Sequence, residues 1–229
     1  MSQLPPSLIS LYLSSIAGVS DLSNLRNLKL KHTNPWWIGK LLRPEYLRLE
    51  LPSITSIPSD LDHLCCLKEL LFIRCKNLLH IGLLPSRLRK LTISHCSVLQ
   101  SIDLSNLQKL LDLSLSFGIP NIQGLEGLRS LYNLNGLERL ENPQLLSIEL
   151  WPLLHTLPNL SNLKYLKDLF LWSCQKLIEI QGLDRLESLQ SITIGGCSSL
   201  QGLPDLSNLK KVEYCDIECC SRGNPRGEV

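Results

Sequence analysis

The sequence predicts an α/β solenoid, a right-handed curved stack of short parallel strands with loops, 3₁₀ turns or short helices on its convex side. Two observations carry this prediction: one leucine-containing string recurs along nearly the whole chain, and its copies are almost evenly spaced. A single copy is too short to bury its own leucines, so neighbouring copies must stack to form a continuous core. Hydrophobic residues make up 44% of the 229 residues and aromatic ones only 5%, so leucine and isoleucine must fill that core.

The repeated string is L-x-x-L-x-L-x-x-C/N, and the last apolar residue of its L-x-L triplet serves as a marker. The markers fall at residues 13, 30, 49, 72, 93, 115, 150, 171, 194 and 214, which lie 17 to 23 residues apart except for one gap of 35. This spacing matches the leucine-rich-repeat period of about 20 to 29 residues. The clearest copies are Leu67/Leu70/Phe72/Cys75, Leu88/Leu91/Ile93/Cys96, Leu166/Leu169/Leu171/Cys174 and Leu189/Ile192/Ile194/Cys197.

The extent of the repeats sets the expected domain organisation. We expect a horseshoe of ten or eleven leucine-rich repeats over residues 1–220, and the long gap indicates one degenerate repeat whose register between residues 119 and 144 stays open. The polar, glycine- and proline-containing residues 221–229 predict a disordered tail.

The alternation within each triplet predicts two faces. The leucines of L-x-L point into the core, and the x residues point to the concave, solvent-facing side. The cysteine that ends the string is expected to sit inside a buried turn, because a thiol is a small hydrophobe and a weak hydrogen-bond donor. The candidate functional residues are therefore sought among the concave x positions.

Large aromatic residues gather at concave positions of two consecutive repeats. The triplets that end at residues 150 and 171 place Trp151, Phe170 and Trp172 on this face, with Glu149 and Asp168 beside them. Adjacent strands lie about 4.8 Å apart, so Trp151 and Trp172 are expected to be lateral neighbours. Because aromatic residues are enriched at binding hot spots, this cluster predicts a contact with a protein partner or a neighbouring domain.

A second, smaller concave patch is expected nearer the N-terminus. Leu71 and Ile73 are apolar x residues of one repeat, and Tyr46 and Arg48 are x residues of the repeat before it. We include these four residues in the predicted protein-binding face. Cover by a loop or an adjoining domain is the structural alternative for both patches.

No residue pattern points to chemistry, so we predict no enzyme activity, no cofactor and no metal. The five histidines form no H-x-x-x-H pair, there is no G-x-S-x-G elbow, and no G-x-x-x-x-G-K-[ST] phosphate loop occurs. The cysteine groups Cys65–Cys66 and Cys215, Cys219, Cys220 lack the paired C-x₂-C spacing of a zinc site.

Charge and composition argue against other classes of partner. The net charge is +2 without a basic run, so we expect neither nucleic acid nor a membrane as partner. The start of the chain resembles no secretory signal, and nine cysteines, an odd number, suit reduced thiols. A cytoplasmic or nuclear location is therefore expected.

The repeats resemble those of the C-terminal leucine-rich-repeat region of plant nucleotide-binding leucine-rich-repeat (TIR-type) disease resistance proteins. The strings that carry the resemblance are LKDLFLWSCQKLIEIQGLDRLESLQSITIGGCSSLQGLPDLSNLKKV, LKELLFIRCKNLLHIG and LPPSLISLYL. The resemblance implies a ligand-sensing or autoinhibitory region in plant innate immunity and signal transduction. Its partner would be a pathogen effector, a host target or the receptor's own nucleotide-binding domain, which this chain lacks.

Other functions remain open beside this one. A free-standing cytosolic scaffold or adaptor in signalling needs no upstream switch domain and is the main alternative. A substrate-reading arm of a ubiquitin ligase is a weaker one, because no F-box segment is visible.

Overall fold

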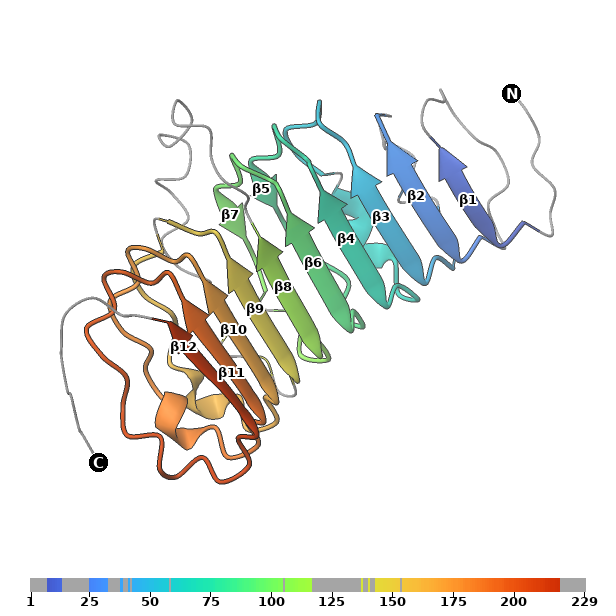
Figure 1. The fold of residues 1–229 in the computed structure, drawn as a ribbon. Helices are drawn as coiled ribbons and strands as arrows, with labels where there is room; N and C mark the ends of the chain where they lie inside the picture. The colour runs from blue at the N-terminus through green and yellow to red at the C-terminus, as the bar shows by residue number, and fades with distance from the viewer. Residues whose placement is uncertain are drawn as a thin grey trace.

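The computed structural model describes residues 8–13, 25–32, 38, 41, 43–57, 59–104, 106–116, 137, 140, 143–152 and 154–218. Ten parallel strands form one long sheet, in the order β1-β2-β3-β4-β6-β8-β9-β10-β11-β12 (Figure 1). Each strand comes from a successive repeat, which confirms the predicted solenoid. The strands are β1 (Ser10–Leu13), β2 (Asn27–Lys31), β3 (Tyr46–Glu50), β4 (Glu69–Ile73), β6 (Lys90–Ser94), β8 (Asp112–Ser116), β9 (Leu145–Glu149), β10 (Asp168–Trp172), β11 (Ser191–Gly195) and β12 (Tyr214–Glu218).

The strands follow from the alternation of the L-x-L triplets. In β10, Leu169 and Leu171 are buried, whereas Asp168, Phe170 and Trp172 are only half-buried on the open face. The same alternation holds in β3, β4 and β8. Neighbouring strands pair without stagger, so Leu169 lies beside Ile192 and Leu171 beside Ile194. The inward side chains therefore form rows along the stack, and one continuous apolar core extends from Leu13 to Leu209.

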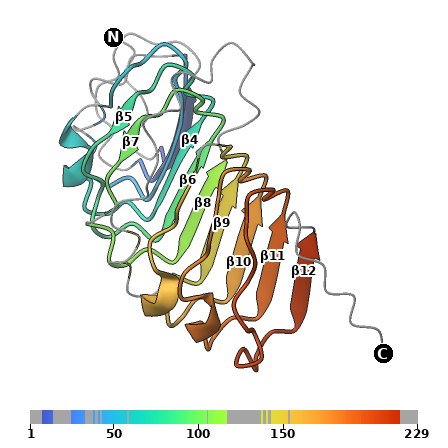
Figure 2. The same cartoon turned by 90° about the vertical axis from the view of Figure 1, so that its left-hand side faces the viewer.

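The convex side returns the chain in tight turns. Among the described residues, the 3₁₀ helices η2 (Ser59–His63), η6 (Leu160–Asn162) and η7 (Leu183–Arg185) lie there, and a two-stranded sheet joins β5 (His80–Ile81) to β7 (Ser101–Ile102) (Figure 2). The backbone N–H of Leu186 donates to Leu183 O at 3.3 Å, and that of Leu189 donates to Leu186 O at 3.0 Å. A 3₁₀ turn has three residues, so leucines spaced by three all face the core. No α-helix occurs within the described ranges.

A left-handed residue ends most strands and turns the chain inward. This residue has a positive φ in His32, Arg74, His95, Leu150, Ser173 and Gly196. After Arg74, His95, Leu150, Ser173 and Gly196 the next residue enters the core, and in four of these five repeats it is a cysteine. The thiols of Cys75, Cys96 and Cys174 donate to a strand carbonyl of the preceding repeat, at 3.5 to 3.9 Å. Each of these thiols thus has a hydrogen-bond acceptor inside the buried turn.

These cysteine slots are apolar and closed. The hydrogen bond with the Cys75 thiol and the burial of the group raise the pKa of the Cys96 thiol above its usual range. The hydrogen bond with the Cys197 thiol and burial do the same to the pKa of Cys174. Both effects favour the neutral thiol, so these cysteines serve as core residues.

One repeat has a different register from the one expected. The sequence interpretation took Ile148 and Leu150 as the inward pair and placed Trp151 on the concave face. In the structure Leu146 and Ile148 of β9 are the inward pair, since they lie beside Leu169 and Leu171 of β10. Leu150 adopts the left-handed turn conformation, with φ of 54°.

Trp151 consequently occupies the slot that Cys174 fills in the next repeat, and it is 0% exposed. The prediction that Trp151 is a concave neighbour of Trp172 is wrong. Leu145, Leu146, Ile148 and Leu150 permit two registers in the sequence, and burial of the large indole in the core favours the observed one.

The last strand differs in register as well. The triplet ending at residue 214 was expected to be inward, but Cys215 and Ile217 take the inward positions, beside Ile192 and Ile194 of β11. Tyr214, Asp216 and Glu218 lie on the open face instead. β8 pairs directly with β9, and most of the stretch between residues 119 and 144, whose register the sequence left open, lies outside the described residues. The predicted tail over residues 221–229 lies outside the described residues.

Candidate functional site

The open face of the sheet brings together most of the predicted binding residues. Its C-terminal part carries Glu149 on β9 and Asp168, Phe170 and Trp172 on β10, and its N-terminal part carries Tyr46 and Arg48 on β3 with Leu71 and Ile73 on β4. All eight side chains belong to half-buried residues on this face. Trp151 is the one predicted member that lies in the core.

Two aromatic rings form the centre of the C-terminal part. The ring centroids of Phe170 and Trp172 lie 6.1 Å apart with an angle of 20° between the planes, so the rings are stacked. Such a pair contributes about 0.5–1.5 kcal/mol beyond its buried area. Stacking therefore favours this arrangement of the two rings.

Gly195, which has no side chain, leaves room for the Trp172 ring. This residue lies beside Trp172 on β11, and a Cβ atom built on it would be 2.2 Å from Cζ3 of the indole. The indole therefore lies flat over the glycine backbone, which is why Gly195 is buried although it lies on the open face. The sequence placed Gly195 at a concave position but gave no indication that it makes room for a ring.

Acidic side chains surround the rings. Glu149 lies beside Trp172 on β9, and the Ser147 hydroxyl donates to Glu149 Oε1 at 3.1 Å. Asp168 lies on the same strand as the rings, and β12 adds Asp216 and Glu218. Open-face positions of β8 to β12 include no lysine or arginine, and every residue of these five strands is described. We call Glu149, Asp168, Phe170, Trp172, Asp216 and Glu218 the aromatic–acidic patch.

The β12 part of the patch was missed at the sequence level. The sequence interpretation placed Lys211, Glu213 and Cys215 on this face because it took Tyr214 as an inward residue. Val212 and Ile217 have the spacing of the first and last apolar positions in L-x-x-L-x-L, and this was the signal that could have suggested the other register. In the structure the Tyr214 hydroxyl donates to Asp216 Oδ2 at 3.4 Å, and Tyr214 is well exposed.

The N-terminal part of the face has the opposite charge balance. Glu50, whose side chain is only 14% exposed, lies 3.5 Å from Lys31, 3.7 Å from Arg74 and 3.9 Å from Arg48. Three cations thus surround one carboxylate, and Lys29 and Lys90 add further positive charge on β2 and β6. Leu71 and Ile73 lie next to this cluster on β4. The sign of the charge therefore changes along the open face, which is basic at β2–β6 and acidic at β9–β12.

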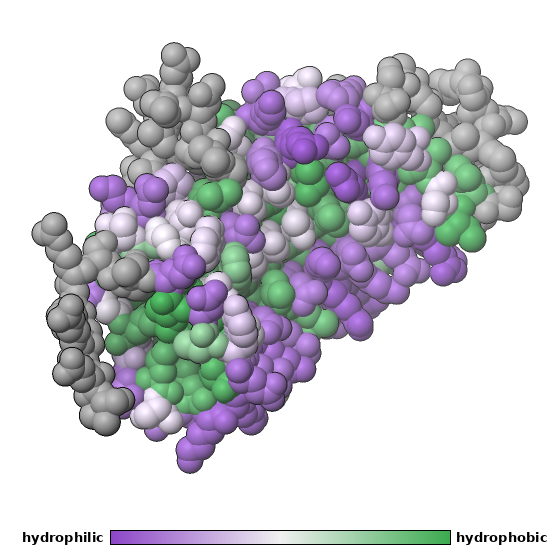
Figure 3. Space-filling view, viewed as in Figure 1, coloured by the Kyte–Doolittle hydropathy of each residue, from purple (hydrophilic) through white to green (hydrophobic). Residues whose placement is uncertain are grey.

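In Figure 3, hydrophobic side chains gather at the C-terminal end of the stack, and a hydrophilic band follows the edge of the sheet at which the strands begin. On the open face, the aromatic–acidic patch has two rings at its centre and carboxylates around them. An apolar centre rimmed by charge is the usual anatomy of a protein interface.

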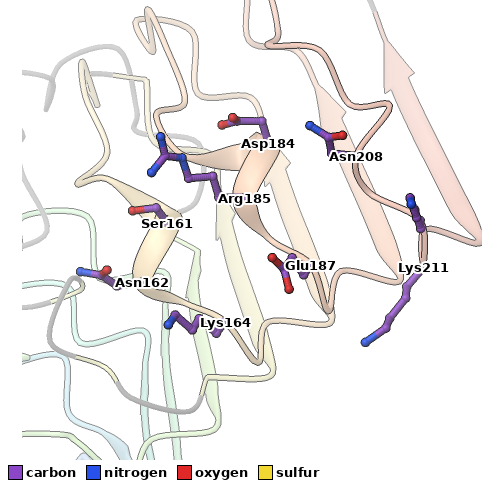
Figure 4. A pocket seen from close by; sticks show the side chains of 9 residues that line it. Ser161, Asn162, Lys164, Asp184, Arg185, Glu187, Asn208 and Lys211 are labelled. Carbon is purple, nitrogen blue, oxygen red and sulfur yellow. The ribbon is translucent and has the colours of Figure 1, made fainter.

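Hollows elsewhere on the surface lack this character. One of about 900 Å³ lies on the flank beside η6 and η7, and Asp184 and Glu187 share it with Lys164, Arg185, Lys210 and Lys211 (Figure 4). It has no aromatic lining and mixes both signs of charge, whereas small-molecule sites are mostly apolar and enclosed. Among the described residues no group of three or more His, Cys, Asp or Glu side chains is placed to hold a metal ion. The described part of the chain also contains no helix long and apolar enough to cross a membrane.

Comparison with known proteins bears on the fold. No protein-family model matches the chain, and no curated protein sequence matches it. Among solved structures, the leucine-rich repeat domain of the type III effector XCV3220 (XopL) aligns with a TM-score of 0.57 at 18% identity, over 93% of this chain and 69% of that one.

More distant alignments reach other bacterial proteins. The functional domain of InlJ from Listeria monocytogenes, which includes a cysteine ladder, aligns with a TM-score of 0.44 at 18% identity, over 97% of this chain and 57% of that one. The Leptospira interrogans leucine-rich-repeat protein LIC12759 aligns with a TM-score of 0.31 at 15% identity, over 95% of this chain and 81% of that one. The parallel sheet, its turns and the likeness to the effector domain together show that this chain has the leucine-rich-repeat solenoid fold.

Proposed function

We propose that the chain is a protein-recognition module and that the aromatic–acidic patch is where its partner binds. The observation that carries the proposal is the stacked pair of Phe170 and Trp172, held in place over Gly195 on an otherwise polar open face. Aromatic side chains with little remaining freedom lose little entropy on binding, which makes them effective anchors.

The charges around the rings indicate the chemistry of the partner. The patch carries the carboxylates of Glu149, Asp168 and Asp216, and none of its residues is a lysine or an arginine. An arginine or lysine of the partner would pack on the ring faces and pair with these carboxylates, and each cation–π contact contributes about 0.5–2 kcal/mol. We propose a basic segment of a partner protein as the occupant, because electrostatic complementarity selects partners and speeds their association.

We further propose that the module is the ligand-sensing or autoinhibitory region of a plant intracellular immune receptor. The support is the resemblance of the strings Leu67–Gly82 and Leu166–Val212 to the repeats of that family. In this hypothesis the chain acts in the cytoplasm or nucleus, and its basic-segment partner is an effector, a host target or the receptor's nucleotide-binding domain. Binding would shift a conformational equilibrium elsewhere in the receptor.

The test of the binding face uses a photo-crosslinking amino acid at Ser191, beside the rings, in the full chain expressed in cells of its source. We expect a crosslinked partner whose yield falls at least fivefold in Trp172→Ala, which removes the ring, and in Gly195→Ala, whose added methyl group displaces the ring from its position over the backbone. Tyr165→Ala is the matched control, since Tyr165 is an exposed aromatic residue outside the face. Equal yields in all variants would contradict the proposal.

A double variant tests whether the partner is basic. Glu149→Gln with Asp168→Asn should weaken the crosslink and make its yield less sensitive to salt. An unchanged yield would be compatible with the aromatic anchor but would contradict a basic partner.

The transcript upstream of Met1 tests the receptor hypothesis: an in-frame nucleotide-binding domain with a phosphate loop supports it. A stop codon directly upstream would favour the free-standing scaffold or adaptor.

A further inference from the structure

A smaller hollow lies on the flank of the solenoid, at the edge where the strands begin. It has a volume of about 360 Å³. Consecutive repeats build it, because Glu45 directly precedes β3, Lys68 directly precedes β4 and Arg89 directly precedes β6. Its lining consists of Glu45, Cys65, Cys66, Lys68, Arg87, Arg89 and Lys109.

The charge of this hollow is strongly positive. Four cations line it against the single carboxylate of Glu45. That carboxylate is already engaged, since Glu45 Oε2 lies 2.6 Å from Lys68 Nζ and Glu45 Oε1 lies 3.5 Å from Arg26 Nη1. No carboxylate of the described chain forms an ion pair with the remaining three, Arg87, Arg89 and Lys109. These three cations are available to an anionic ligand.

The two cysteines in the lining differ from those of the core. Cys65 is exposed and Cys66 is half-buried, whereas Cys75, Cys96, Cys174 and Cys197 are buried. Thiol reactivity requires access, and neighbouring cations attract anionic reagents. An accessible thiol and an unpaired cationic lining therefore occur in the same hollow.

We propose that this hollow is a modification site that takes anionic low-molecular-weight disulfides of the glutathione type, with Cys65 as the residue modified. Arg87, Arg89 and Lys109 would hold the carboxylates of the disulfide. The Cys65 thiol loses its proton to solvent, and the thiolate sulfur attacks one sulfur of the bound disulfide. A new S–S bond forms to Cys65, the original S–S bond breaks, and its electron pair leaves on the departing thiolate.

The chain contains its own control for this proposal. Cys215 is also exposed, but it lies on β12, outside this hollow, and Glu213, Asp216 and Glu218 outnumber Lys210 and Lys211 among its neighbours in sequence. Acidic surroundings should repel an anionic disulfide and attract a cationic one. The two cysteines should therefore show opposite charge selectivity in the same sample.

The experiment measures the rates at which the full chain reacts with dianionic dithiobis(nitrobenzoate), glutathione disulfide and dicationic cystamine, resolved by site with peptide mass spectrometry. At low ionic strength the ratio of anionic to cationic rates at Cys65 should exceed the ratio at Cys215 at least tenfold. The estimate assumes about twofold per cation at roughly 8 Å in water, with a smaller opposite effect at Cys215. Added salt should bring the two ratios together.

Variants assign the selectivity to the hollow. The triple change Arg87→Gln, Arg89→Gln and Lys109→Gln should lower the Cys65 ratio about tenfold, and the control Lys176→Gln should not, since Lys176 is an exposed cation of a distant loop. Cys66→Ser should keep the effect at Cys65. Equal ratios at Cys65 and Cys215, a ratio insensitive to salt, or a triple variant that reacts like the unmodified chain would overturn the proposal. The salt dependence is measured on the unmodified chain and does not depend on the folding of any variant.

Discussion

At the level of single residues, the slot that follows each left-handed turn accepts side chains of very different size. Cys75, Cys96, Cys174 and Cys197 occupy it as small buried thiols, and Trp151 occupies it as a fully buried indole. What these residues share is an apolar body that leaves water when the repeats stack. The same residue type therefore has two roles here, because Trp172 lies on the open face while Trp151 is part of the core.

The first prediction follows from this difference in burial. Trp151→Ala should lower the free energy of unfolding by about 3–5 kcal/mol, since it leaves a cavity in the core. Trp172→Ala should lower it by no more than about 1.5 kcal/mol, the value of its stacking contact. Urea denaturation of both variants provides the measurement. Equal losses would indicate that Trp151 lies on the open face after all.

The two tryptophans also show what the sequence can and cannot place. Leu169 and Leu171 flank Phe170 without a competing leucine, so alternation alone put Phe170 and Trp172 on the correct face. Around Trp151, leucines and an isoleucine occur in two registers separated by two residues, and the repeat string fits both. Only the packing of a whole repeat against its neighbours chooses between them. The seat of Trp172 on Gly195 is likewise a contact between repeats, which no local pattern reveals.

At the level of elements, neighbouring repeats are joined by side chains as well as by the sheet. Glu45, before β3, accepts a hydrogen bond from Lys68, before β4, at 2.6 Å. This bond and the charge of Lys68 lower the pKa of the Glu45 carboxyl from its ordinary value, with a smaller effect from Arg26. Strand order and pairing could be predicted from the spacing of the triplets, but contacts of this kind depend on the lengths of the connecting turns.

The second prediction concerns the titration of Glu45. Because its folded pKa is lowered, its contribution to stability is complete above the unfolded value of about 4.3 and is lost as the pH falls through the folded value. Lys68→Met should return the Glu45 pKa towards the ordinary value, as measured by carboxyl carbon chemical shifts. Lys76→Met, at an exposed lysine of the same repeat, should leave it unchanged. A Glu45 titration that is identical in all three proteins would contradict the ion pair.

At the level of the whole molecule, the solenoid is held together by contacts between successive repeats. Strands in the middle of the sheet have a partner on both sides, as β10 has in β9 and β11. In the described sheet β12 pairs with β11 alone, and its inward residues Cys215 and Ile217 remain exposed. Repeat proteins of this kind gain stability from each interface between neighbours, so stability should vary along the stack.

The third prediction is a gradient of local stability at the C-terminal end of the sheet. Amide hydrogen exchange should be faster in β12 than in β10, because opening β12 breaks one strand interface and exposes little additional apolar surface. A difference of about tenfold or more in protection is expected, which corresponds to about 1.4 kcal/mol. Ile217→Ser should leave exchange in β10 unchanged, since its side chain is already partly in water, whereas Ile194→Ser, in the buried row of β11, should raise exchange in both β11 and β12. If β12 were protected as strongly as β10, an additional contact would have to cover its outer side. In that case the aromatic–acidic patch, which includes Asp216 and Glu218 of β12, would be more enclosed than the open face indicates.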